Sequence, residues 1–433
     1  MDRRWHELVV QAETAVKPIW KEIAAVEAIN QKRVLEAFHR AGVTSGHLGT
    51  STGYGLGDNG REAVDRTFAL ALQAEASFVR TQIVSGTHAL AICLEGLLDR
   101  RGTLVAATGR PYDTLWPVLQ HLQERGVSYV ELPSAPDAGR TVGGAAHGHA
   151  NAAVDWPDRA MLADAVRQAS RVGPVTVLIQ RSRGYARRPS LGPDAIGALA
   201  EAARTGYPQA VVLVDNCYGE FASDREPTAV GADIMAGSLI KNPGGGIVPS
   251  GGYIAGRKDL LEQVAWRLTA PGIGAEEGPS LLPNRLLLQG LFMAPHIVAE
   301  ALRGAVVIAY TMAALGYDVS PAWNEPRHDI VQAVRLGSPQ ALLAFCRGIQ
   351  AAGPVDHAAL PEPAPMPGYA DQIVMAAGTF VQGATIELSA DAPLRPPYEA
   401  FVQGGLTYQH VRLGLLSVLE TLEESRLLRP AGA

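Results

Sequence analysis

The chain alternates between short apolar runs and amphipathic segments. The apolar runs are bounded by turn residues, a pattern typical of buried strands, and they lie at 104–107, 127–132, 175–180, 211–215, 234–240 and 252–256. Between them, apolar residues recur at helical spacing over 61–76, 159–171 and 194–205. The succession of strand, helix and strand predicts an α/β fold with a mostly parallel central sheet and right-handed crossovers.

The two ends of the chain carry different patterns. Helical spacing covers 8–40, where Pro18 is expected to kink or divide the helix. A long helix is expected over 285–314, interrupted near Pro295. Beyond it, the pattern predicts strands at 317–319, 330–336, 372–377 and 384–388 and helices at 339–351 and 408–424, which is an α+β mixture.

The 433 residues are enough for two or three compact units. The patterns divide them into an N-terminal helix and interface loop (1–60), a large domain (61–290) and a small C-terminal α+β domain (291–433).

Two charged residues stand at the carboxyl ends of buried runs. Asp215 ends the run 211–215, and Lys241 follows the run 234–240. Such positions lie at the edge of the sheet where α/β folds bind ligands. An acid and an amine held there suit pyridoxal phosphate, because a carboxylate keeps the pyridine nitrogen protonated and an amine forms the Schiff base. An ordinary strand-end aspartate and a solvated lysine are the alternative interpretation. Ser238, a candidate phosphate donor, and the glycines at 244–246 favour the ligand.

Other residues are candidates for binding an anion or an aromatic ring. Ser85, Gly86 and Thr87 stand where a helix is expected to begin, which describes both a helix cap and an anion site. The glycine-rich stretch 41–61 is either a linker or an active-site loop, in which Tyr54 and Arg61 reach a phosphate. Tyr112, at a strand-to-helix turn, is either a core tyrosine or a ring that stacks on a cofactor. The four arginines within 181–188 indicate a solvated face, an anionic ligand or a subunit contact.

Composition narrows the class of protein. Hydrophobic residues make up 47% and charged residues 18% of the chain, as in a well-packed globular protein. A net charge of −6 without a long basic tract argues against nucleic acid as a partner, and nothing marks a membrane-binding surface. The 3 cysteines form no CxxC pair, which argues against a disulfide framework and against a metal site. The N-terminus reads as an amphipathic helix rather than a signal peptide, so we expect a cytoplasmic protein.

Several motifs together resemble a known family. They are Asp-Asn-Cys-Tyr-Gly-Glu-Phe at 215–221, Ala-Gly-Ser-Leu-Ile-Lys-Asn-Pro-Gly-Gly-Gly at 236–246 and Gly-Gly-Tyr-Ile-Ala-Gly-Arg at 251–257, supported by the segments 85–89, 110–114, 182–185 and 403–408. In this combination the chain resembles the pyridoxal-phosphate-dependent proteins of the aluminium resistance or methionine gamma-lyase family. The resemblance implies the aspartate aminotransferase fold (fold type I) and a homodimer or homotetramer with shared active sites.

The resemblance also implies roles for individual residues. Lys241 is expected to form the Schiff base, Asp215 to pair with the pyridinium nitrogen and Tyr112 to stack on the ring. Phosphate is expected to bind to Ser85, Gly86, Thr87 and Ser238. Tyr54 and Arg61 resemble the tyrosine and arginine of a loop that, in related lyases, contacts the phosphate bound to a neighbouring subunit. For the substrate carboxylate we expect Arg395 first and Arg183 second, because a guanidinium binds a carboxylate through two hydrogen bonds. Tyr112 or Tyr218 is the candidate to protonate the leaving group.

The function implied is β- or γ-elimination on a small amino acid, with carbon–sulfur cleavage of a cystathionine-like or methionine-like substrate as the leading hypothesis. Elimination of a non-sulfur group, such as halide from a γ-substituted or unsaturated amino acid, is an alternative. Two others are an aminotransferase and a stress-resistance protein that binds pyridoxal phosphate without turnover. The fold alone does not choose among them.

Overall fold

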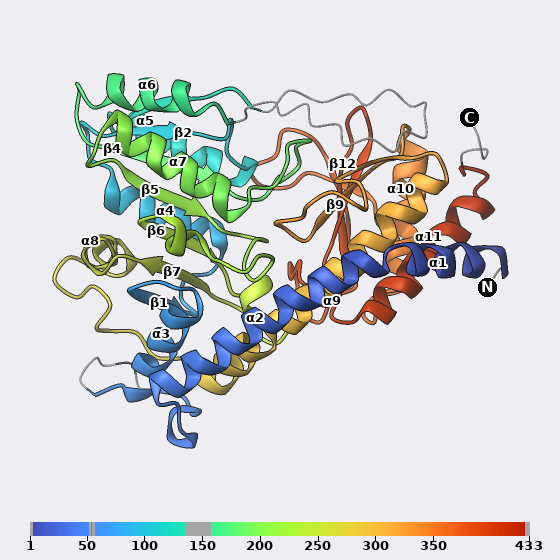
Figure 1. The fold of residues 1–433 in the computed structure, drawn as a ribbon, viewed down its shortest axis with the longest axis horizontal. Helices are drawn as coiled ribbons and strands as arrows, with labels where there is room; N and C mark the ends of the chain where they lie inside the picture. Colours follow the sequence, from blue (N-terminus) through green and yellow to red (C-terminus); the bar gives the residue numbers. More distant parts are fainter. Residues whose placement is uncertain (1–2, 52, 54–56, 135–156, 429–433) are drawn as a thin grey trace.

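The fold consists of two layered units, each built around one β-sheet (Figure 1). The computed structural model describes residues 3–51, 53, 57–134 and 157–428. A seven-stranded sheet, the large sheet, has the order β1-β7-β6-β5-β4-β2-β3, and a six-stranded sheet, the small sheet, has the order β10-β11-β12-β13-β9-β8.

The large sheet is mostly parallel, as predicted. Its strands are β1 (Ala76–Arg80), β2 (Thr103–Ala106), β3 (Ser128–Glu131), β4 (Val175–Gln180), β5 (Val211–Asp215), β6 (Ile234–Ser238) and β7 (Gly252–Gly256). Strands β3, β2, β4, β5 and β6 pair in parallel, and β7 runs antiparallel to both β6 and β1. The expected α/β fold with a mostly parallel sheet is therefore confirmed.

Helices cover both faces of the large sheet, which explains why its inner strands are apolar throughout. Successive residues of β5 show the pleat, because Val212 and Val214 enter one core and Leu213 enters the other. The first core includes side chains from α6 and α7, and the second includes side chains from α4, α5 and α8. The helices of this unit are α3 (Asn59–Ala71), α4 (Gly86–Leu97), α5 (Trp116–Glu124), α6 (Arg159–Ala169), α7 (Pro193–Gly206) and α8 (Lys258–Leu268).

The small sheet pairs antiparallel between each of its described neighbours. The strand expected at 384–388 is wrong, because the strand begins at Ser389, and a strand at 399–403 was not predicted. Both strands carry buried polar side chains, so an apolar run does not mark them. The strands are β8 (Asp318–Ser320), β9 (Val331–Arg335), β10 (Pro363–Ala364), β11 (Ile373–Ala376), β12 (Ser389–Pro393) and β13 (Glu399–Gln403), with the helices α10 (Pro339–Ala351) and α11 (Tyr408–Glu424).

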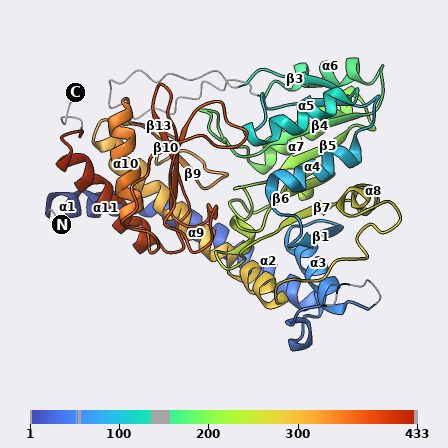
Figure 2. The same cartoon turned by 180° about the vertical axis from the view of Figure 1, so that it is seen from behind.

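Three further helices join the two units. Helices α1 (Arg3–Ala15) and α2 (Lys17–Ala41) are divided at Val16, as Pro18 predicted. Helix α1 packs into the core of the small sheet, and α2 runs beside α9 (Asn284–Ala314) in both views (Figures 1 and 2). Short 3₁₀ turns lie at Ser45–His47, Asp113–Leu115, Pro227–Val230 and Asn242–Gly244.

Helix α9 continues through Pro295, so the expected interruption is wrong. The helix packs against both cores along most of its length, and this burial outweighs the hydrogen bond that a proline removes. By length and composition α9 is apolar enough to cross a membrane, yet 72% of its most apolar window is buried inside the protein. It serves here as a core helix shared by the two sheets.

The contact between α10 and α11 gives a test of this packing. A Cβ atom added at Gly348 in α10 would lie 2.5 Å from Cα of Val418 in α11. We expect Gly348→Ala to force the helices apart and to lower the free energy of unfolding by about 1–3 kcal/mol. Gly49→Ala is the control, since an added methyl group there meets nothing within 4 Å. Equal stability of the two variants in denaturant titrations would contradict the close contact.

Candidate active site

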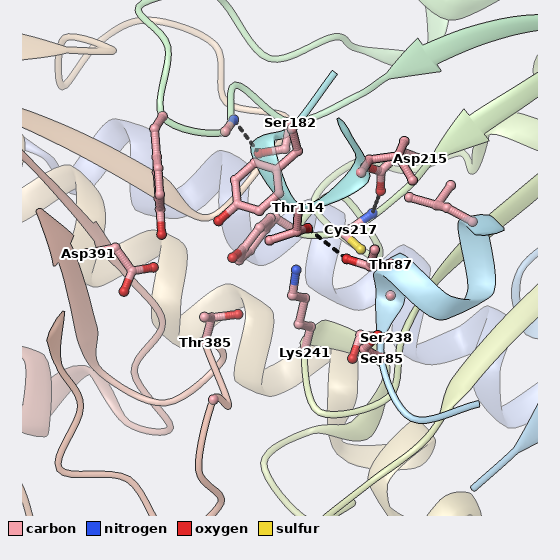
Figure 3. A pocket seen from close by; sticks show the side chains of 18 of the residues that line it. Ser85, Thr87, Thr114, Ser182, Asp215, Cys217, Ser238, Lys241, Thr385 and Asp391 are labelled. Carbon is pink, nitrogen blue, oxygen red and sulfur yellow. Dashed lines mark hydrogen bonds between the residues drawn. The ribbon is translucent and has the colours of Figure 1, made fainter. Parts of the chain in front are cut away.

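A cavity of about 380 Å³ lies between the carboxyl ends of the central large-sheet strands and the small sheet (Figure 3). On the large-sheet side it is lined by Ser85, Gly86, Thr87, Tyr112, Gln180, Ser182, Tyr185, Asp215, Cys217, Tyr218, Ser238 and Lys241, among others. On the other side it is lined by Met366, Pro367, Tyr369, Ile373, Met375, Gly383, Thr385 and Asp391. Most of the residues singled out in the sequence therefore meet in one place.

Asp215 and Lys241 both line this cavity. Asp215 is the last residue of β5, and its Oδ1 accepts a hydrogen bond of 3.1 Å from the backbone N–H of Cys217. Lys241 follows β6 by three residues, and its Nζ lies 3.9 Å from the centroid of the Tyr218 ring. The two strands are parallel neighbours, with Asp215 opposite Ala236, so their carboxyl ends open on the same edge of the sheet.

Burial and neighbouring side chains shift the pKa values of both groups. Burial raises the pKa of the Asp215 carboxyl, while the charge of Lys241 and the hydrogen bond from Cys217 lower it, and the net direction is upward. Burial lowers the pKa of the Lys241 amine, while the neighbouring side chains of Cys217, Tyr218, Asp215 and Glu220 raise it by more. The cavity therefore favours a positive charge beside the Asp215 carboxylate.

The start of α4 forms the anion-binding end of the cavity. The Ser85 Oγ caps the helix by accepting a 3.0 Å hydrogen bond from the N–H of His88. Gly86, Thr87 and Ser238 also line the cavity there. A Cβ atom on Gly86 would lie 2.9 Å from the Cys217 sulfur, so glycine is needed for the helix to start this close to the loop after β5. Free N–H groups and the helix dipole make this end suited to a phosphate, and the cap and the anion site coexist.

Tyrosines line the middle of the cavity. The Tyr112 hydroxyl is hydrogen-bonded to that of Tyr369, and the Tyr112 backbone N–H donates to Gln180 over 2.9 Å. Burial raises the pKa of Tyr112 well above its usual range, so the hydroxyl stays protonated at neutral pH. Tyr218 lies beneath the Lys241 amine with a left-handed backbone φ of 70°, and burial raises its pKa too. Both hydroxyls can therefore donate a proton into the cavity.

The arginines of the predicted site lie elsewhere. Arg183 is buried, and its Nη1 donates to the carbonyl and hydroxyl oxygens of Ser320 at 2.8 and 3.0 Å. Arg395 is half exposed and pairs with Asp371 at 2.8 Å. Neither residue lines the cavity, and the described part of its wall holds no arginine. Arg61 is buried and donates to backbone carbonyls of its own chain at 276 and 278, and Tyr54 lies outside the described residues.

The arginine-rich segment 181–188 forms internal links, so its interpretation as a solvated face is wrong. The Arg181 side chain is 0% exposed and pairs with Glu226 at 3.1 Å. Arg188 donates to the backbone carbonyls of Thr108 and Ser182. Arg187 pairs with Asp318 of β8 at 2.9 Å and with Glu399 of β13. Together with Arg183, Arg187 fixes the loop after β4 to the small sheet.

Several residues of the cavity wall were not predicted as site residues, among them Asp391, Tyr185 and Tyr369. Tyr185 lies in the segment 182–185, which carries part of the family resemblance, and Asp391 lies in β12, which was not predicted, so neither position shows a pattern that assigns a role. Tyr369 lies in a loop between β10 and β11, where no periodicity marks it. A polar or aromatic residue that reaches a cavity from a distant part of the chain leaves no local signal.

Comparison with known proteins decides the family. The sequence profile of the methionine gamma-lyase family matches residues 5–423. The chain belongs to this family. The methionine gamma-lyase family match covers nearly the whole chain, including every described residue of the cavity wall.

Close relatives support the assignment. YnbB of Bacillus subtilis, an uncharacterised protein, is 42% identical over 427 residues, covering 97% of this chain and 96% of its own length. A crystal structure of a carbon–sulfur lyase involved in aluminium resistance from Clostridium novyi has a TM-score of 0.87 and 38% identity, and it covers 98% of this chain and 96% of that one. A pyridoxal-5′-phosphate-dependent protein from Escherichia coli, 16% identical over 93% of this chain and 97% of its own with a TM-score of 0.59, shares the fold. The fold type I prediction is therefore confirmed.

Glu220, in the loop after β5, is a buried carboxyl. Glu220 is 0% exposed, accepts a 2.8 Å hydrogen bond from the Tyr253 hydroxyl, and burial raises its pKa to about 8. The unfolded chain loses this proton near the ordinary value of 4.5, whereas the folded protein keeps it until about pH 8. Because only the unfolded chain loses the proton in this window, the free energy of unfolding falls as the pH rises, by at most about 1.4 kcal/mol per pH unit.

Glu220→Gln tests this burial. Glutamine keeps the acceptor for Tyr253 and cannot ionise, so we expect the stability of the variant relative to the native protein to increase between about pH 5 and about pH 8. Denaturant titrations at both pH values measure the difference. Glu262→Gln, at an exposed site on α8, is the control and is expected to show no such trend. A stability difference for Glu220→Gln that does not change with pH would contradict the assignment.

Proposed function

We propose that this protein is a pyridoxal-phosphate-dependent lyase that cleaves the carbon–sulfur bond of a small thioether amino acid by β- or γ-elimination. The observation that carries the proposal is the meeting of the Lys241 amine, the Asp215 carboxylate and the start of α4 in one cavity. Membership of the methionine gamma-lyase family and likeness to the carbon–sulfur lyase of Clostridium novyi support the type of bond. Cystathionine-like and methionine-like amino acids are the substrates we expect.

The residues present fit the cofactor. An amine is available for the aldehyde, a carboxylate for the ring nitrogen, and helix N–H groups with Ser85, Thr87 and Ser238 for the phosphate. The missing side chain of Gly86 leaves room where the phosphate end would approach the helix. When bound, pyridoxal phosphate supplies an electron-accepting ring that stabilises negative charge at the substrate α-carbon.

The chain's own residues then supply the proton transfers. Asp215 holds a proton at the ring nitrogen, because a buried carboxylate pairs best with a cation. The Lys241 amine lies where it can remove the α-proton once it is free and uncharged. Tyr112 and Tyr218 keep their hydroxyl protons at neutral pH, so either can protonate the departing sulfur. Apolar side chains at Met366, Ile373 and Met375 limit the access of water.

The assembly belongs to the same proposal. We infer a homodimer or homotetramer with shared active sites.

Removal of the amine tests the cofactor assignment. We expect Lys241→Ala to lose the absorbance of covalently held cofactor near the visible edge, and turnover to fall by about a thousandfold or more. Lys258→Ala, on the exposed surface of α8, is the control and is expected to keep both. A Lys241→Ala protein that retains the absorbance and the turnover would show that another amine holds the cofactor.

A panel of amino acids tests the reaction. Elimination from an S-alkyl cysteine consumes one water and releases one thiol, one pyruvate and one ammonium ion, so we expect the three products in equal amounts. The measurement follows thiol, keto acid, ammonia and halide together. Halide without thiol would indicate another leaving group, and keto acid without ammonia would indicate amine transfer. Retained cofactor with no product from any amino acid would indicate a protein that binds pyridoxal phosphate without turnover.

A further inference from the structure

Asp391 places a buried carboxylate on the substrate side of the cavity. It lies in β12, is 4% exposed and lines the cavity wall formed by the small sheet. In the close view Asp391 lies on the side away from Asp215 and Thr87, with the Lys241 amine between them (Figure 3). From this position Asp391 would face the far end of a substrate bound near Lys241.

The partners of Asp391 are neutral. Gln403 Nε2 donates a 2.7 Å hydrogen bond to its Oδ2, and the Tyr185 hydroxyl also hydrogen-bonds to the carboxylate. Within the described residues, no ion pair joins Asp391 to a lysine, arginine or histidine of this chain. Burial raises the pKa of Asp391 by more than the hydrogen bonds from Gln403 and Tyr185 and the charge of Lys241 lower it, so the net direction is upward. A buried carboxylate of this kind is stabilised when a cation arrives beside it.

Aromatic rings border the same carboxylate. The Tyr185 ring stacks on Tyr369 with centroids 5.6 Å apart, and it lies 5.2 Å from the ring of Phe401. Tyr112 meets Tyr185 edge to face at 5.3 Å. Aromatic faces beside a carboxylate are the combination that binds organic ammonium groups, through cation–π attraction and an ion pair. The wall is therefore suited to a cation.

The charges of the described lining favour a cation over an anion at this wall. Lys241, Asp215 and Asp391 are the charged residues in the described lining, and the proposed function commits the first two to the cofactor. A carboxylate at the far end of the substrate side chain would then meet Asp391 and, among the described lining residues, no uncommitted cation. A zwitterionic far end, such as that of cystathionine, would gain one contact and suffer one repulsion.

We propose that the leaving group of the natural substrate carries an ammonium group without a neighbouring carboxylate, and that Asp391 binds it. The inference rests on the proposed carbon–sulfur lyase function, and it narrows the cystathionine-like and methionine-like substrates proposed there to thioether amino acids whose far end carries an ammonium group alone. The substrate class is a thioether amino acid whose sulfur bears an aminoalkyl chain. Cleavage of the carbon–sulfur bond releases an aminoalkyl thiol, with the sulfur gaining a proton, while the amino acid half leaves as keto acid and ammonium ion after the addition of water.

Two substrates of nearly equal shape test the proposal on the loaded enzyme. S-(2-aminoethyl)cysteine carries the ammonium group, and S-propylcysteine replaces it with a methyl group. We expect the native enzyme to favour the first by at least about tenfold in kcat/KM. In Asp391→Asn we expect this preference to disappear, with kcat/KM falling at least about tenfold more for S-(2-aminoethyl)cysteine than for S-propylcysteine. Asp371→Asn is the matched control, because it removes a carboxylate paired with the half-exposed Arg395 and should leave the preference intact.

Binding is measured separately from turnover. Titration of the cofactor absorbance with each substrate gives an affinity even where no thiol is released, so a failed lyase assay rejects the proposed function while the affinities still judge the role of Asp391. The comparison of the two substrates on the native enzyme also decides the matter if Asp391→Asn does not fold.

Three outcomes overturn the inference. The first is a native enzyme with no preference for the aminoethyl compound, or with a preference for cystathionine over it. The second is an equal loss for both substrates in Asp391→Asn, which would assign Asp391 to the α-amino group common to both. The third is loss of the preference in Asp371→Asn, which would assign it to the charge at that exposed site.

Discussion

The large sheet is organised around a carboxylate and an amine that are kept out of water within one cavity. Isolating either charge in the interior costs several kcal/mol, so each is tolerable only with the other, or with a ligand, nearby. Parallel pairing of β5 and β6 supplies the geometry, because it brings the end of one strand beside the loop that follows the other. Behind them, Asn216 links the buried pair of Arg181 and Glu226 to the Tyr253 hydroxyl and holds the loop after β5 in place.

Sequence patterns predicted the cofactor side of the cavity better than the substrate side. Strands such as β5 are apolar throughout because helices cover both faces, so a run such as 211–215 is visible and the charged residue at its end is conspicuous. Strands β12 and β13 carry Asp391 and Gln403 on buried positions, and those polar side chains interrupt the apolar runs by which strands are recognised. The elements that sequence missed are therefore the ones whose polarity the site requires.

The contacts of residues that pair across long sequence separations could not be predicted from the sequence either. Arg183 and Arg187 were recognised as unusual, yet a guanidinium pairs with whichever acceptors the fold brings to it, and here these come from residues about 130 to 210 positions away. Likewise, Pro295 predicted a break in α9, but the packing of that helix against two cores is a tertiary effect that no local window contains. Local propensity is a property of short segments, whereas these ion pairs and this helix packing form only in the folded protein.

The two walls of the cavity belong to separate sheets, joined through the arginines after β4 and the shared helix α9. Lys241, Asp215 and the start of α4 come from one sheet, and the residues from Met366 to Asp391 come from the other unit. Under the proposed function, substitutions in the second set would change which compounds fit while leaving the first set untouched. Such a division would let a lineage acquire new substrates without changing the residues proposed to hold the cofactor, and it marks 366–391 as the segment to randomise when a different selectivity is wanted.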